Sequence, residues 1–149
     1  MSLQNDVMAA MKVAMKEKDQ TALTALRAVK SAILLAQTES GASSELTEEQ
    51  ELSLLQKLVK QRKDSAAIYI EQNRQDLAQP ELDEVDVISQ FLPEAMSEEE
   101  IEKVVLNTID ITGAEGMKDM GRVMGIVSKQ LAGQADGKTI STIVKQKLQ

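Results

Sequence analysis

Apolar side chains recur every three or four residues along almost the whole chain, and this spacing restricts the chain to helices. After Asp19, for example, the apolar positions step by four, three, four and three residues from Ala22 to Ala36. That period is typical of one face of an α-helix and of a seam between packed helices. We find no two-residue alternation and no hairpin turn signal in the sequence. The pattern therefore predicts an all-α protein.

Capping residues and turn residues divide the pattern into an N-terminal body of about four helices and a three-helix tail. Six of the seven expected helices begin at a side chain able to accept a backbone N–H bond, in one case followed by a proline. The predicted starts are Ser2, Asp19, Thr47 with Gln50, Asp76 with Pro80, Ser97 with Glu100, and Asp136. Gly41 suits a left-handed cap at the end of the second helix, and Pro93 ends the fourth. We expect an N-terminal helical domain over residues 1–93 and a tail domain over 97–149.

Missing residue types exclude several classes of function. The chain has no Cys and no His, so it has no disulfide, no thiolate or imidazole metal site and no Cys–His or Ser–His–Asp nucleophile. It has one Phe, one Tyr and no Trp, which argues against a platform for stacking single-stranded bases. We therefore expect no catalytic residue, no metal and no cofactor in this chain.

Charge is distributed unevenly along the chain. The net charge is −7 overall, but residues 117–149 hold six Lys and Arg against two Asp and Glu, a local charge of +4. A local excess of cations is the electrostatic signature of phosphate binding. The spacing puts Lys118, Arg122 and Lys129 on one helix face, where we expect them to stay in water. The candidate RNA-binding residues are Lys118, Arg122, Lys129, Lys138, Lys145 and Lys147.

A second basic patch lies on the third predicted helix. It consists of Lys57, Lys60, Arg62 and Lys63 within two turns. Either it binds phosphate, or it is a solvated helix face paired with neighbouring carboxylates. Arg62 also interrupts the apolar stripe of its helix. Its head is then a buried anchor, or it pairs with a carboxylate of the fourth helix such as Asp83 or Asp86.

Two further patterns have a structural and a functional interpretation. Gly121 and Gly125 lie four residues apart, and the charges of Arg122 and Lys129 exclude a membrane dimer motif. We expect close contact with a neighbouring helix there, the alternative being approach of the helix backbone to a ligand. The eight Met residues are expected to fill a core poor in aromatics, the alternative being an adaptable partner surface.

An ordered set of short stretches resembles one known family. The stretches are residues 26–33 (LRAVKSAI), 60–66 (KQRKDSA), 91–94 (FLPE), 117–125 (MKDMGRVMG) and 133–138 (GQADGK), followed by 143–145 (IVK). In this order they resemble the YqeY family, small bacterial proteins that share a domain with the tail of the B subunit of the aminoacyl-tRNA amidotransferase. The resemblance implies an all-α protein whose tail is similar to a tRNA-contacting module.

The family label also carries carbon–nitrogen ligase activity with glutamine as amido donor, for which the chain lacks the parts. A thiol glutaminase needs Cys, the amidase type needs a Ser–Ser–Lys arrangement, and ATP activation needs a nucleotide pocket; we find none of these in the sequence. The leading hypothesis is a non-catalytic, tRNA-associated accessory module. The alternatives are a protein–protein interaction module and a contributor to that ligase activity within a complex.

The expected partners follow from these hypotheses. They are tRNA and a tRNA-charging or amidotransferase complex. We expect no membrane partner, because no apolar run approaches the roughly 18–20 residues that a span needs. The N-terminus lacks the basic start and apolar core of a secretory signal, so we expect a cytoplasmic protein.

Overall fold

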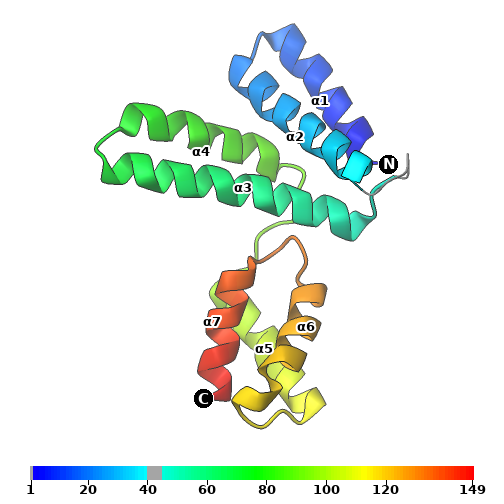
Figure 1. Ribbon diagram of the computed structural model, residues 1–149, viewed down its shortest axis with the longest axis vertical. Helices are drawn as coiled ribbons and strands as arrows, with labels where there is room; N and C mark the ends of the chain where they lie inside the picture. The colour runs from blue at the N-terminus through cyan, green and yellow to red at the C-terminus, as the bar shows by residue number, and fades with distance from the viewer. Residues whose placement is uncertain (1, 40–44) are drawn as a thin grey trace. The chain divides into compact units, whose positions relative to one another are not determined.

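The computed structural model describes residues 2–39 and 45–149, and within these ranges the protein consists of helices joined by short turns (Figure 1). The described residues form no β-strand, so the predicted all-α class is confirmed. Contacts divide the chain into two compact units, Met1–Leu92 and Pro93–Gln149. The predicted cap at Gly41 lies outside the described residues.

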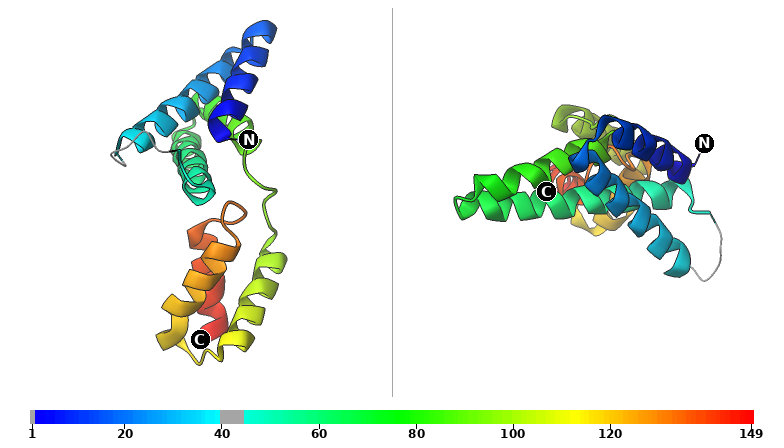
Figure 2. Two further views of the ribbon diagram at one scale, coloured as in Figure 1. Left: turned by 90° about the vertical axis from the view of Figure 1, so that its right-hand side faces the viewer. Right: turned by 90° about the horizontal axis from the view of Figure 1, so that it is seen from above.

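The first unit is built from two helical hairpins. Its helices are α1 (Leu3–Glu17), α2 (Gln20–Glu39), α3 (Glu48–Glu71) and α4 (Gln75–Ser89). Helix α1 packs on α2, α3 lies along α4, and α2 also packs against α4 (Figures 1 and 2). Leu26, Leu55 and Ile88 from three of these helices are fully buried in one cluster. The apolar stripes read from the sequence thus meet in a common core.

Most helices begin at the side chains that the sequence predicts. Ser2 Oγ accepts from the backbone N–H of Asn5 at 3.3 Å, and Asp19 Oδ1 accepts from that of Ala22 at 3.0 Å. Both predicted capping boxes, at Thr47 and at Ser97, have their reciprocal bonds. These bonds satisfy N–H groups that have no partner inside the helix.

The start of α4 differs from the prediction. Helix α4 begins at Gln75 without a side-chain cap bond, and Pro80 lies inside it instead of opening it. Because proline has no N–H, the carbonyl of Asp76 lacks its usual helical donor four residues on. The helix nevertheless continues, because Ala78, Val85 and Ile88 are buried against the first unit's other helices.

The second unit is a bundle in which three helices pack pairwise. It contains α5 (Glu98–Thr112), the short 3₁₀ helix η1 (Met117–Asp119), α6 (Met120–Gln130) and α7 (Gly137–Leu148) (Figure 2). Val105, Val123, Val127 and Val144 are fully buried at its centre. Gly113 and Gly116 have φ angles of 67° and 87° in the turn before α6, a region that favours glycine.

The Met residues were predicted to fill the core, but they lie at its edges or on the surface. Met8, Met15 and Met117 are 43–54% exposed, and the other described Met residues are half-buried around the two clusters. The buried clusters are made of Val, Leu, Ile and Ala instead. Branched aliphatic side chains and Ala fill the two clusters, and four of the more flexible Met side chains pack against their edges.

Candidate nucleic-acid interface

The cations of α6 lie on the face that points away from the core of the second unit. Arg122 and Lys129 are exposed, and Lys118 is exposed in η1 directly before the helix. Val123 and Val127, on the opposite side of α6, are fully buried. The helical period therefore separates the cations from the core, as the sequence predicts.

Arg122 is also part of the turn between α5 and α6, which corrects the expectation that it only meets water. Its Nη2 donates to the carbonyl oxygen of Thr112 at 3.3 Å and lies 3.3 Å from Asp119 Oδ1. The other carboxylate oxygen of Asp119 accepts from the backbone N–H of Glu115 at 2.8 Å. Arg122 therefore stabilises the fold as well as offering charge on a side chain that is still 52% exposed.

Four lysines of the second unit keep their charge free for a partner. Lys118 and Lys129, and Lys138 and Lys145 on α7, have no carboxylate of the described chain within ion-pairing distance. Lys147 differs, because its Nζ lies 2.8 Å from Glu102 Oε1 on α5. The six candidate cations thus divide into four free lysines and two residues that also hold the bundle together.

The start of α7 is occupied by its own cap. Asp136 Oδ1 accepts from the backbone N–H of Thr139 at 2.7 Å. An anion at this helix start would compete with that carboxylate. Lys138 therefore offers its charge through its exposed amine and not as part of a helix-terminus phosphate site.

The second basic patch does not form one surface. Lys57, Lys60 and Lys63 are exposed on α3, and Lys60 Nζ lies 3.8 Å from Asp64 Oδ2 one turn away. Arg62 turns to the other side of the helix, toward α4. The patch is therefore a solvated helix face plus one inward arginine.

Arg62 pairs with a carboxylate of the fourth helix, as predicted, but this is Glu84 and neither of the two named candidates, Asp83 and Asp86. Arg62 Nε lies 3.8 Å from Glu84 Oε1, and Nη1 donates to the carbonyl oxygen of Leu58 at 3.1 Å. Burial raises the pKa of the Glu84 carboxyl, and the attraction of Arg62 opposes that rise. Asp83 instead accepts from Gln79, and Asp86 is exposed. Arg62 is therefore an internal tie between α3 and α4.

The two glycines of α6 do not make the predicted close contact with a neighbouring helix. Gly121 and Gly125 are both exposed, and a Cβ added to either would meet no atom within 4 Å. A glycine inside a helix costs roughly 1 kcal/mol relative to alanine. Packing among the described residues does not offset that cost, because the space beside both glycines is open.

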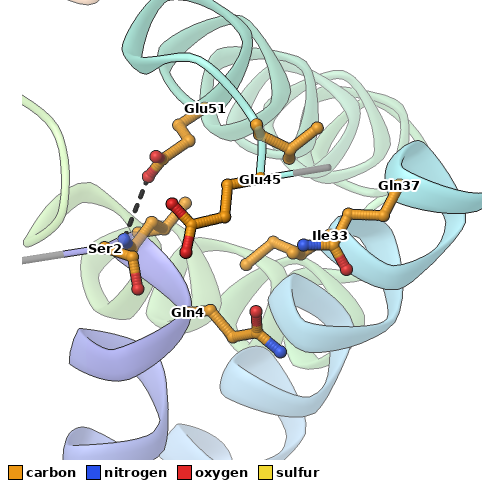
Figure 3. A pocket seen from close by; sticks show the side chains of 8 residues that line it. Ser2, Gln4, Ile33, Gln37, Glu45 and Glu51 are labelled. Atoms are coloured by element: carbon orange, nitrogen blue, oxygen red, sulfur yellow. Dashed lines mark hydrogen bonds between the residues drawn. The ribbon is translucent and has the colours of Figure 1, made fainter. Parts of the chain in front are cut away.

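Two hollows among the described residues of the first unit have acidic walls and do not suit a phosphate. One, of about 340 Å³, lies between the start of α1, the end of α2 and the start of α3, with Glu45 and Glu51 in its wall (Figure 3). Glu51 accepts there from the backbone N–H of Leu3 at 3.0 Å. A wider hollow beside it adds Asp6 and Glu48. Within the described ranges, no group of three or more acidic side chains is placed to hold a metal ion.

The sequence interpretation did not identify the carboxylate partners of Arg122, Arg62 and Lys147, although the spacing of one of these pairs is visible in the sequence. Asp119 lies three residues before Arg122, which is the spacing of an ion pair on a helix. Glu84 and Glu102 had no such signal, because their partners come from other helices.

Comparison with known proteins identifies several that are similar to this chain in sequence. The chain is 30% identical to altered inheritance of mitochondria protein 41, mitochondrial, of Pyrenophora tritici-repentis, over 91% of this chain and 75% of the relative. The protein of the same name from Clavispora lusitaniae is 33% identical over 82% of this chain and 72% of its own length. A glutamyl-tRNA(Gln) amidotransferase subunit of Thermococcus gammatolerans is 45% identical over 36% of this chain, a stretch that spans only 9% of that relative.

In the part of the chain that the structure describes, no helix is long and apolar enough to cross a membrane.

The family assignment rests on nearly the full length of the chain. The Yqey-like protein family matches residues 4–148, which include all of the helices described above except the edge of the first. The chain therefore belongs to the Yqey-like protein family.

Proposed function

We propose that this protein is a non-catalytic accessory module that binds tRNA through the cations of its second unit. The observation that carries the proposal is the set of four free lysines: Lys118, Lys129, Lys138 and Lys145. Free surface amines bind phosphate and release the counterions around it. The similarity to a subunit of an enzyme named for glutamyl-tRNA(Gln) supports tRNA as the RNA.

The mode of binding follows from what the second unit lacks. Both aromatic residues of the chain, Tyr69 and Phe91, precede this unit. Bases therefore find no aromatic side chain to stack on, and we propose contact with the phosphates and shape of a folded RNA. An amidotransferase or tRNA-charging complex is the proposed setting, and cytoplasmic location stays a prediction.

Docking to a protein partner is the second candidate function. It is favoured by Met8, Val13 and Met15, which leave apolar area of α1 open to solvent. Apolar contact of this kind depends weakly on salt, whereas phosphate binding weakens steeply as salt rises. A contribution to glutamine-dependent ligase activity would require such a complex.

Charge reversal at two free lysines tests the RNA proposal. Lys118→Glu/Lys129→Glu should abolish or strongly weaken tRNA binding, measured by fluorescence anisotropy in about 50–100 mM salt. For the matching variant with Ala at both positions, the slope of log K against log salt should fall by about 2, since each lost duplex phosphate contact removes about 0.9. Arg122 stays unchanged, because its bond to Thr112 would confound binding with folding.

The control places the same charge change on the first unit. Lys12 and Lys16 are exposed on α1 and, within the described chain, form no ion pair. Lys12→Glu/Lys16→Glu should leave most of the affinity intact. The proposal is wrong if the wild-type chain does not bind tRNA in this salt range, or if both reversals weaken binding equally.

A further inference from the structure

The exposed side of α6 carries two glycines beside its cations. We call this surface the open face; its members are Gly121, Arg122, Gly125, Ile126 and Lys129, all exposed. They gather on one side because residues three and four apart are neighbours on a helix. Lys118 precedes the face in η1, so a cation stands near each end of the glycine pair.

We propose that the open face receives the sugar–phosphate backbone of a folded RNA, with the helix backbone at Gly121 and Gly125 in direct contact with it. This inference rests on the proposed function. It adds the place where the RNA lies and gives the glycines a role that packing within the chain does not supply.

The space beside both glycines is open. A Cβ added to Gly121 or Gly125 would meet nothing within 4 Å, so the fold itself accommodates alanine at both positions. Both φ angles lie in the ordinary helical range, so backbone conformation does not require glycine either. A partner whose surface comes closer to the helix than a Cβ allows would give both glycines a role.

The charge around the open face favours a polyanion. Lys118 and Lys129 have no carboxylate of the described chain within ion-pairing distance, and the two carboxylate oxygens of Asp119 are held by Arg122 and by the backbone N–H of Glu115. A partner that covers the glycines also covers these amines, and it must neutralise them. The sugar–phosphate backbone does so along its whole length, and the wide, shallow minor groove of an RNA helix admits contact by shape.

Adding one methyl group at each glycine tests the inference. Gly121→Ala/Gly125→Ala should raise the melting temperature by a few degrees, because alanine favours the helix, and should still weaken tRNA binding by about tenfold, or about 1.4 kcal/mol. The salt slope should stay unchanged, since no cation is lost. Gly125→Leu should weaken binding further than Gly125→Ala, because the larger side chain holds the RNA farther from the helix.

Gly137→Ala is the matched control. Gly137 is exposed at the start of α7, and a Cβ there also meets nothing within 4 Å. This variant should bind tRNA as the wild type does.

Each result decides something different. A wild type that does not bind tRNA overturns the proposed function and this inference together. A wild type that binds, with a double alanine variant of equal affinity, overturns the inference alone and leaves a partner helix as the occupant of the face. A double variant that melts below the wild type also overturns it, because the space beside the glycines would then be needed by the fold.

Discussion

The ion pair between Arg62 and Glu84 should contribute little net stability to the first unit, but removing either partner alone should destabilise it. Both side chains are about five-sixths buried, with 15% and 16% of their area exposed, and Nε lies 3.8 Å from Oε1. At an effective dielectric constant of about 20, two charges at this distance attract by about 4 kcal/mol. Dehydrating each ion costs several kcal/mol. For the intact pair, the attraction roughly offsets the cost of dehydration. For either charge alone, nothing offsets that cost.

The size of the effect follows from that balance. Arg62→Met keeps an apolar stem between α3 and α4 but leaves the Glu84 carboxylate without its counterion. Removing one partner of a buried pair costs about 3–5 kcal/mol, and the remaining exposure reduces this to about 2–3 kcal/mol here. In Arg62→Met/Glu84→Gln no charge remains at the site, so at least half of the loss should return. Urea unfolding followed by circular dichroism measures all three free energies of unfolding.

The pH dependence provides an independent check. Burial raises the pKa of Glu84 above 4.5, so the folded chain binds this proton more tightly than the unfolded chain does. Its contribution to stability is therefore fully present below the unfolded pKa and is lost as pH rises through the folded pKa. Arg62→Met removes the opposing attraction and raises that pKa further. Its deficit should shrink between about pH 7.5 and about pH 5.

Three outcomes would refute this reasoning. One is an Arg62→Met variant within about 0.5 kcal/mol of the wild type, the size of an ordinary surface substitution. Another is a double variant no more stable than the single one. The third is a deficit that grows as the pH falls. Lys60→Met is the matched control, since its pair with Asp64 is 70% and 66% exposed and contributes little.

Two further predictions concern the second unit. Ser97→Ala removes the acceptor of the Glu100 N–H and should cost about 1 kcal/mol in urea unfolding; an unchanged midpoint would show that the capping box contributes nothing to stability. Asp119→Ala removes the acceptor of the Glu115 N–H and the partner of Arg122, and should lower the free energy of unfolding by about 1–2 kcal/mol. Asp110→Ala, at an exposed position of α5, is the control for the second change.

Much of the helical framework was predictable because its causes are local. A Ser or Thr three residues before a Glu or Gln satisfies the first N–H groups of its own helix. The local sequence at Thr47 and Ser97 therefore predicts the starts of α3 and α5. The start of α4 was not predictable in this way. Proline at position 80 is normally a signal of a helix start, and only packing of the residues around it carries the helix through.

In the candidate site, too, the features with local causes were predictable and those that depend on other helices were not. The period of α6 alone places Arg122 and Lys129 opposite Val123 and Val127, and the structure agrees; Lys118 is also exposed, but it lies in η1 before the helix. Which cations are free depends on other helices. Arg122 bonds to the end of α5 and Lys147 to Glu102, and neither partner has a fixed spacing in sequence from its cation. Sequence therefore predicts the face of a charged side chain better than its partner.

The glycines of α6 show what such a pattern leaves undecided. Two glycines four residues apart indicate that something approaches the helix closely, but the spacing is the same whether that object is a helix of the chain or a partner. Within the second unit, the described residues place no helix against this face, because the space beside Gly121 and Gly125 is open. The proposed contact with a polyanionic partner would account for a helix that has glycine at two positions and free lysines near both ends.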